Sequence, residues 1–129
     1  MRALPAVALI GALGACQPAP APNSEAPVEP RITAGCDLEV VFGSYAGGTD
    51  PGLGAQIGEL LANDPGVANV ERTPWGREGE YNLCVRATDD AAADRLYRAI
   101  AAMIPDSSRR APTSVTHRDG RRRAADYPQ

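Results

Sequence analysis

The sequence contains no lysine: all thirteen basic residues are arginine, in a chain of 129 residues with a net charge of −3. Without lysine the chain cannot form a lysine Schiff base, and it cannot supply the lysine of a Walker A phosphate loop. The negative net charge argues against a nucleic-acid binder, because such proteins carry an excess of positive charge to meet phosphates. We therefore expect no nucleic-acid partner and neither of those two enzyme mechanisms.

Large aromatic side chains and histidine are also scarce, with one Phe, one Trp, four Tyr and one His. The core must therefore be assembled from Val, Leu, Ile and Ala. A Ser-His-Asp triad would have to combine His117 with Ser44 or Ser114, and neither serine lies in a nucleophile elbow. We interpret His117 as an exposed residue at a strand end, and we expect no catalytic residue, no metal site and no cofactor.

The first residues have the pattern of an exported protein. Arg2 precedes an apolar run, Ala3 to Leu13, which has the length of a signal peptide and is too short to span a bilayer. The run ends in Leu13-Gly14-Ala15-Cys16, which resembles the lipobox of bacterial lipoproteins at all four positions. The resemblance implies that residues 1–15 are a signal peptide and that Cys16 receives lipid, which anchors the mature chain to a membrane.

The lipobox resemblance also implies a location in the bacterial cell envelope. Gln17, rather than an Asp, follows the cysteine, and this favours the outer membrane, with the domain facing the periplasm. Residues 16–35 then comprise the lipidated cysteine and a tether that is rich in Pro and Ala, for which we expect disorder. The alternative is cleavage by the general signal peptidase, with Cys16 an incidental thiol.

Residues 36–118 show the hydrophobic periodicities of one small α+β domain. Four strands are predicted, over Asp37 to Tyr45, Val67 to Trp75, Glu80 to Ala87 and, as an edge strand, Ala111 to His117. Two helices are predicted, starting at Asp50-Pro51 and at Thr88-Asp89-Asp90 and ending at Asn63-Asp64-Pro65-Gly66 and Pro105. The order β-α-β-β-α-β resembles the ferredoxin-like fold, which implies a four-stranded antiparallel sheet with two helices on one face.

Cys36 and Cys84 are the cysteines that remain once Cys16 is lipidated, and an exported compartment permits their oxidation. In the ferredoxin-like arrangement the first and third strands are antiparallel neighbours, so the two cysteines would lie close together. If Leu83 and Val85 face the helices, Cys84 faces away from them, and Cys36 must then lie in irregular chain before the first strand. We expect a disulfide, with two separate thiols as the alternative.

Two surfaces of the predicted domain are candidates for partner contact. Trp75, Arg77 and Glu78 place an aromatic ring and charges at the tip of the predicted hairpin, where a partner could dock. The alternative is that Trp75 folds back onto the sheet. The sheet face away from the helices is a second candidate, and it would carry Val41, Asn82, Cys84 and Arg86.

Arginines gather near the C-terminus, namely Arg109, Arg110, Arg118, Arg121, Arg122 and Arg123. We interpret residues 119–129 as a solvated, disordered tail. Contact of this basic end with anionic lipid, lipopolysaccharide or an acidic partner is the alternative.

These observations favour a non-enzymatic envelope lipoprotein whose tethered domain binds an envelope protein or polymer. The residues leave two alternatives open. One is a small periplasmic hydrolase or sensor that uses Ser44 and His117. The other is a protease-inhibitor-like domain, because inhibitor propeptides also use ferredoxin-like folds.

The lipid anchor is testable by intact mass spectrometry of the protein from the membrane fraction. We expect a mature chain that starts at Cys16 and carries added acyl mass, because a lipobox directs both reactions. The Cys16→Ala variant should lack the acyl mass and leave the membrane fraction. A wild-type chain without acyl groups would contradict the prediction.

Overall fold

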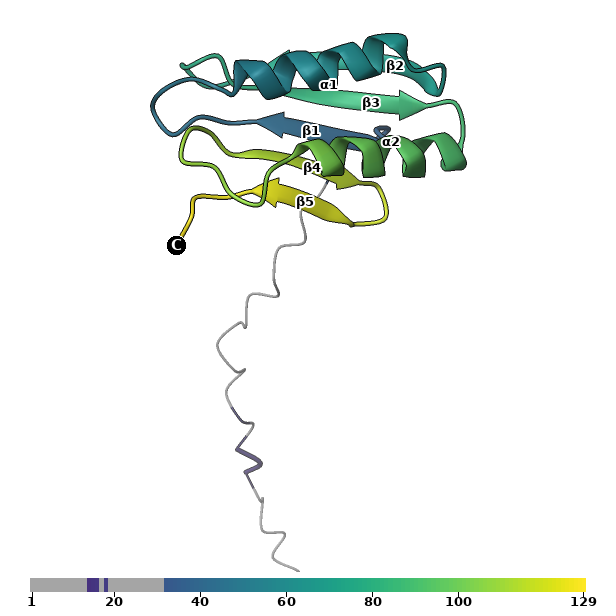
Figure 1. Ribbon diagram of the computed structural model, residues 1–129. Helices are drawn as coiled ribbons and strands as arrows, with labels where there is room; N and C mark the ends of the chain where they lie inside the picture. The colour runs from purple at the N-terminus through teal and green to yellow at the C-terminus, as the bar shows by residue number, and fades with distance from the viewer. Residues whose placement is uncertain (1–13, 17, 19–31) are drawn as a thin grey trace, which may run out of the picture.

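The computed structural model describes residues 14–16, 18 and 32–129, so the predicted signal segment up to Leu13 and most of the predicted tether lie outside the described residues. The described chain is an α+β domain with a five-stranded antiparallel sheet and two helices (Figure 1). Its elements are β1 Leu38–Phe42, α1 Pro51–Asn63, β2 Val67–Pro74, β3 Tyr81–Ala87, α2 Asp90–Met103, β4 Thr113–His117 and β5 Arg122–Ala125. The strands lie in the order β2-β3-β1-β4-β5, and every neighbouring pair is antiparallel.

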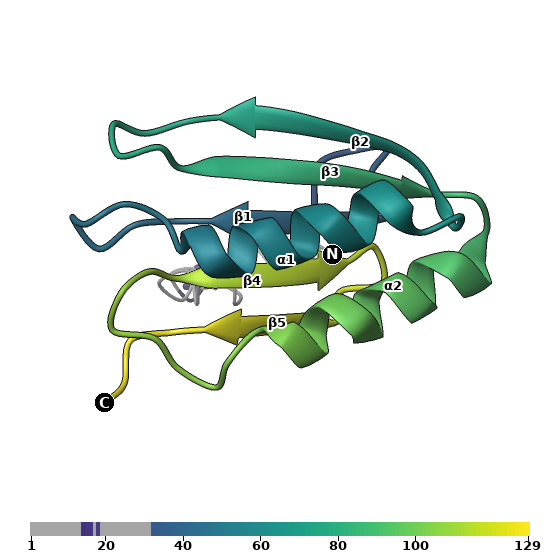
Figure 2. The ribbon, with the colours of Figure 1, turned by 45° about the horizontal axis from the view of Figure 1, so that its top comes forward.

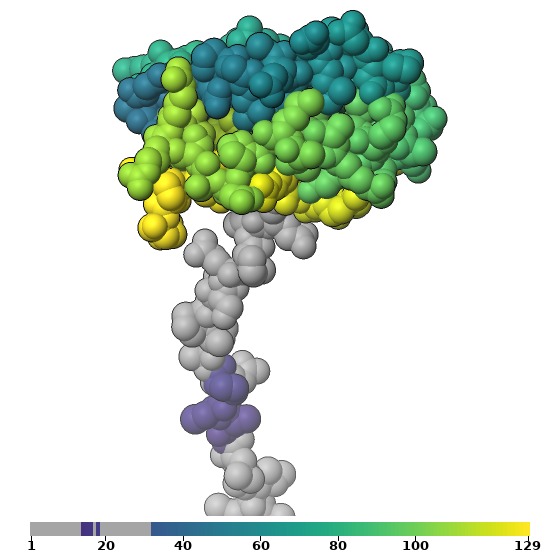
Figure 3. All heavy atoms as spheres, viewed as in Figure 1, coloured from purple at the N-terminus to yellow at the C-terminus, as the bar shows by residue number. Residues whose placement is uncertain are grey.

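The sheet has two different faces. Both helices lie on one of them, which we call the helix face, and no helix of the described chain covers the other, the open face (Figure 2). In the space-filling view α1 and α2 lie next to each other and form a continuous outer layer (Figure 3). The domain therefore buries one face of its sheet under helices, as the sequence predicts.

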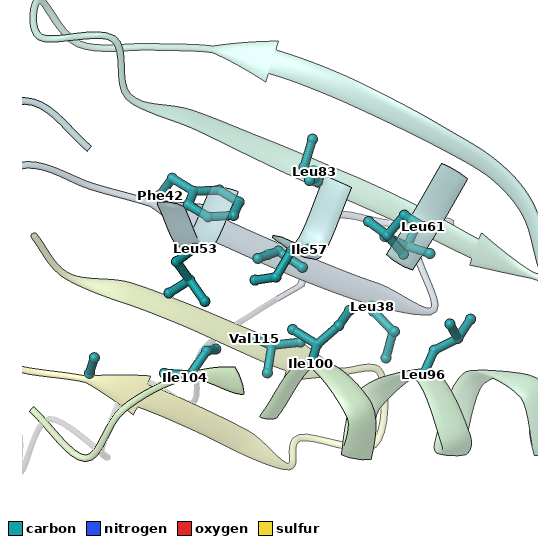
Figure 4. Close-up of a cluster of buried hydrophobic side chains, with 13 residues drawn as sticks. Leu38, Phe42, Leu53, Ile57, Leu61, Leu83, Leu96, Ile100, Ile104 and Val115 are labelled. Carbon is teal, nitrogen blue, oxygen red and sulfur yellow. The ribbon is translucent and has the colours of Figure 1, made fainter. Parts of the chain in front are cut away.

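The hydrophobic core lies between the helices and the sheet. β1 contributes Leu38, Val40 and Phe42, all fully buried on the helix face. Ile57 of α1 and Ile100 of α2 point into the same cluster (Figure 4). The core is thus largely aliphatic, as the scarcity of aromatic residues predicts. Burial of each such side chain stabilises the fold by about 1.5–3 kcal/mol.

Both helices begin at the predicted aspartates. The carboxylate of Asp50 accepts a hydrogen bond from the Leu53 amide at 3.0 Å, and Pro51 occupies the first turn. The carboxylate of Asp89 accepts one from the Ala92 amide at 2.7 Å. Each cap satisfies an amide that has no partner within the helix, which stabilises the helix by about 1 kcal/mol.

The expectation of four strands is wrong, because the chain forms a fifth. β5 pairs with β4, from Thr113 opposite Ala125 to Thr116 opposite Arg122. β4 is consequently an inner strand instead of the predicted edge, and residues 119–129, which we interpreted as a disordered tail, contain β5 at the edge.

A tight turn at Gly120 allows the chain to fold back from β4 and form β5. The Gly120 amide donates to the His117 carbonyl at 2.9 Å, and the His117 amide donates to the Arg121 carbonyl at 2.8 Å. Gly120 has a positive φ of 96°, a conformation that glycine adopts without strain. The strand that follows is short and rich in arginine, so it lacks the apolar alternation from which strands are predicted.

Cys36 and Cys84 form a disulfide across a Cα–Cα distance of 5.3 Å, which confirms the predicted pair. Cys36 precedes β1 in a turn where its amide donates to the Thr33 carbonyl at 3.1 Å. This placement in irregular chain is the one that the sequence requires. Cys84 lies opposite Glu39, on the open face of the sheet.

The disulfide should stabilise the domain by constraining the unfolded chain. The bridge joins residues 48 positions apart, for which the loop-entropy model gives about 4 kcal/mol at most. We expect the Cys36→Ser and Cys84→Ser double variant to lose about 2–4 kcal/mol of unfolding free energy in urea titrations. The reduced wild type should match it, and an unchanged unfolding midpoint in both would contradict the prediction.

A bidentate ion pair joins the end of α1 to α2. Arg95 binds the Asp64 carboxylate through both guanidinium nitrogens, at 2.6 and 2.7 Å. The Gly66 amide donates to the same carboxylate at 2.8 Å. These bonds lower the pKa of Asp64 from 3.8 to about 2, and the bond from Arg95 has the largest effect. The folded state therefore favours the ionised carboxylate.

This lowered pKa predicts an acid-dependent contribution to stability. Stabilisation by ionised Asp64 is present above its unfolded pKa and is lost as the pH falls from about 4 through about 2. Asp64→Asn should therefore lower the urea midpoint at pH 7, and its difference from wild type should shrink towards pH 2. Glu59→Gln, at an exposed carboxylate on α1, is the matched control and should change little. An Asp64→Asn effect independent of pH would contradict the assignment.

Candidate functional site

Trp75 directly follows β2 and folds back onto the open face of the sheet. Its indole N–H donates to the Asn82 side-chain oxygen at 2.7 Å. The side-chain amide of Asn82 donates in turn to the carboxylate of Glu39 at 3.1 Å. Trp75 still remains 45% exposed. The ring is therefore held in a defined orientation and is accessible to a partner.

Glu39 is the centre of this hydrogen-bond network. Only 9% of the residue is exposed, and its carboxylate also accepts the Thr33 amide at 2.9 Å and the Thr33 hydroxyl at 3.0 Å. Three donors thus satisfy a carboxylate whose burial would otherwise be costly. The network joins the segment before β1 to Trp75 across the open face. Asn82 belongs to the predicted contact face, whereas the sequence marks Glu39 only as an ordinary outward residue of a strand and gives no sign of this network.

A hollow of about 130 Å³ lies beside Trp75 on the open face. Its lining residues come from four segments of the chain and comprise Val41, Gly43, Trp75, Pro112, Thr113, Ser114, Arg122, Ala124 and Asp126. Arg122 has no acidic partner within 4.0 Å in the described part of the chain. The hollow therefore combines an aromatic ring with an uncompensated guanidinium group.

The hairpin tip is tied to the loop that follows β1. The Ser44 hydroxyl donates to the Glu78 carboxylate and accepts amide hydrogen bonds, including one from Gly48 at 2.9 Å. The Glu78 amide donates to the Glu80 carboxylate at 2.8 Å. Of the three predicted contact residues, Glu78 is thus engaged within the domain, whereas Arg77 is exposed and has no acidic partner within 4.0 Å among residues 32–129.

Exposed aromatic side chains gather at the end of the sheet to which β1 and β2 run. This end, which we call the loop end, carries loop 43–50, hairpin 75–80, loop 104–112 and the segment after β5 (Figures 1 and 2). Tyr45, Trp75 and Tyr127 are 40%, 45% and 52% exposed, and they are three of the four large apolar side chains exposed in the described chain. Tyr45 and Tyr127 pack edge to face with ring centroids 5.5 Å apart.

The loop end also carries two exposed arginines, Arg109 and Arg110, in loop 104–112. The Arg109 guanidinium lies 5.9 Å from the centre of the Tyr127 ring. Arg109 and Arg110 have no acidic partner within 4.0 Å in the described segments. Trp75 and Asp126 line the same hollow, and Tyr127 is the next residue along the chain. Sequence analysis missed Tyr45 and Tyr127, because only the sheet order brings their loops together.

Three arginines of β5 and its turn have acidic partners, and the fourth, Arg122, has none within 4.0 Å among the described residues. Arg118 binds Asp37 at 2.6 Å and also Asp90. Arg121 binds Asp94 at 2.6 Å, which lowers the pKa of that carboxyl group. A third pair joins Arg123 to Asp106 at 2.6 Å. Three of the six arginines in the basic end that the sequence predicts are therefore paired with acidic groups of the folded domain.

His117 is buried, so its interpretation as an exposed strand-end residue is wrong. Only 6% of the residue is exposed, because the turn into β5 and Tyr97 of α2 cover it. Its Nδ1 lies 3.1 Å from the Asp119 amide and 2.9 Å from the Asp119 carboxylate. Its Nε2 has no hydrogen-bond partner among the described residues.

The structure does not bring His117 together with either candidate serine. His117 lies opposite Leu38, whereas Ser44 follows Phe42 at the far end of β1, roughly 13 Å along the strand. Ser114 lies three residues before His117 in β4 and therefore faces the opposite side of the sheet. Neither pair has the hydrogen-bond contact that nucleophile activation requires.

No helix of the described chain is long and apolar enough to cross a membrane. Residues 14–16, 18 and 32–129 contain no group of three or more His, Cys, Asp or Glu side chains placed to hold a metal ion. The chain matches no protein-family model, and comparisons with curated proteins and with solved structures likewise find no match.

Proposed function

We propose that this chain is a lipid-anchored protein of the bacterial cell envelope whose domain binds another envelope protein or polymer without catalysing a reaction. The lipobox pattern supports an anchor on Cys16, and Gln17 supports placement in the outer membrane, facing the periplasm. Cys16 carries a free, exposed thiol, which is compatible with modification. The loop end is the proposed contact surface.

The observation that carries this proposal is the gathering of exposed aromatic and arginine side chains at the loop end. Trp, Tyr and Arg are the residue types that contribute most to binding energy in protein interfaces. The hydrogen bond from Trp75 to Asn82 and the packing of Tyr45 on Tyr127 hold these rings before a partner arrives. Such preorganisation reduces the conformational entropy that binding would otherwise cost.

Geometry gives less support to the hydrolase alternative. A catalytic serine needs a base within hydrogen-bond reach, and His117 lies away from both Ser44 and Ser114. The hydroxyl of Ser44 is instead bonded to Glu78 and to loop amides. A binding role needs only the exposed groups of the loop end, and it requires no serine and histidine within hydrogen-bond reach of each other.

We also propose that the domain is a ferredoxin-like fold extended by one strand. The chain order from β1 to β4 is β-α-β-β-α-β, and the strands β2-β3-β1-β4 lie side by side with both helices on one face (Figure 2). β5 then adds to the free edge of β4. This proposal concerns architecture alone, because the fold supports many unrelated functions.

Site-specific photo-cross-linking in the native host tests the contact surface. A photoreactive side chain at Arg77, which is exposed at the hairpin tip, should form a defined adduct with an envelope component. The same group at Ala102, exposed on α2, is the matched control and should not. Trp75→Ala should reduce the adduct at position 77 by at least about tenfold, because interface tryptophans often contribute more than 1.4 kcal/mol. Equal adducts at both positions, or none at position 77, would contradict the proposal.

A further inference from the structure

β2 is the longest strand of the sheet and forms one of its edges. It pairs with β3 on one side, and every residue after Val67 is exposed. Val70 is 38% exposed and is the one large exposed apolar side chain of the described residues that lies away from the loop end. The opposite edge, β5, is shorter, with four residues, and a short edge strand offers less backbone for pairing.

The hydrogen-bonding pattern of the hairpin shows which groups of β2 point outward. The Trp75 amide donates to the Glu80 carbonyl at 2.9 Å. In an antiparallel ladder such pairs alternate, so Thr73 and Glu71 also bond towards β3. The amides and carbonyls of Val70 and Arg72 therefore point away from the sheet, where another strand could meet them.

The charges of β2 restrict how two copies of this strand can pair. A twofold axis through a residue places that residue opposite itself. An axis through Glu71 would oppose two carboxylates, and an axis through Arg72 would oppose two guanidinium groups, which is destabilising. An axis closer to the C-terminal end of β2 would include Pro74, which lacks an N–H, in the paired segment. An axis closer to the N-terminal end would include the shift in the β2–β3 ladder between Val67 and Asn69.

We propose that β2 pairs antiparallel with β2 of a second copy about a twofold axis at Val70. In this register Val70 meets Val70, and Glu71 lies opposite the neutral Asn69 of the second copy. Val70 is opposite buried Val85 in the sheet, so its side chain is on the helix face and the two valines extend the core across the axis. The outward amide and carbonyl of Val70 supply two hydrogen bonds at the axis.

The regular part of this ladder is short, from Asn69 to Glu71 in each copy, so we expect a weak dimer in solution. Anchoring in a membrane would raise the local concentration of the copies and favour pairing. The pairing itself depends neither on the lipid nor on the loop end, so it can be tested separately from the proposed function.

Cysteine cross-linking of the full chain carrying Cys16→Ala tests the register. Residues opposite each other in a hydrogen-bonded pair have Cα atoms about 5.5 Å apart, within disulfide range. Val70→Cys should therefore form a disulfide-linked dimer under mild oxidation. Glu71→Cys is the matched control: the two cysteines would lie about 7–8 Å apart on the diagonal, so its yield should be at least about tenfold lower. Intact mass without reduction reports the linked species.

Sedimentation of the same chain without an added cysteine gives an independent measurement. We expect the mean mass to rise between about 1 and 100 µM, and Val70→Lys to abolish the rise by opposing two charged groups. A thermal melt of Val70→Lys verifies that the variant is folded. Cross-linking that is as strong at position 71 as at position 70, cross-linking at neither, or a monomer at every concentration would overturn the proposal.

Discussion

The burial of β1 is the constraint on which the rest of the structure depends. This strand lies between β3 and β4, and three of its five residues, Leu38, Val40 and Phe42, are fully buried against the helices. A central strand that pairs on both sides has its backbone groups satisfied, and both neighbours of β1 pair with it antiparallel in defined registers. The positions of Cys84, Asn82 and Ser114 on the open face follow from those registers.

The opposite face of the same strand organises the candidate site. Glu39 is buried there, and its carboxylate is satisfied by Thr33 and Asn82, which in turn accepts the indole of Trp75. One carboxylate therefore joins the entry of the chain into the domain to the exposed aromatic ring. Because hydrogen bonds to a charged group are comparatively strong, this network is a physical reason for the fixed position of Trp75.

The arginines divide into two groups according to their surroundings. Arg118, Arg121 and Arg123 are paired with aspartates of the folded domain. Arg77 and Arg109 at the loop end have no acidic partner within 4.0 Å among the described residues, and Arg109 lies 5.9 Å from the centre of the Tyr127 ring. The unpaired arginines leave positive charge accessible at the loop end, which a binding surface there can use.

Local features of the sequence were sufficient for most of the fold. Asp50 and Asp89 identify the helix starts because a capping carboxylate acts within four residues, and apolar periodicity identifies β1 to β4 because each strand buries one face. The pairing of Cys36 with Cys84 also followed, since adjacent antiparallel strands bring the two residues together. β5 could not be predicted in this way, because its four residues bury little and are held by pairing with β4 and by a turn at Gly120.

The sequence by itself determined the α+β class, the helix caps, four of the strands and the disulfide pair, all of which depend on neighbours in the chain or on a single strand pairing. Tertiary structure alone decided the burial of His117, the carboxylate network of Glu39 and the packing of Tyr45 on Tyr127. These features join residues from distant segments, and their contacts exist only once the sheet order places those segments side by side. The physical reason is that periodicity records which face of an element is buried, whereas a site depends on which elements meet.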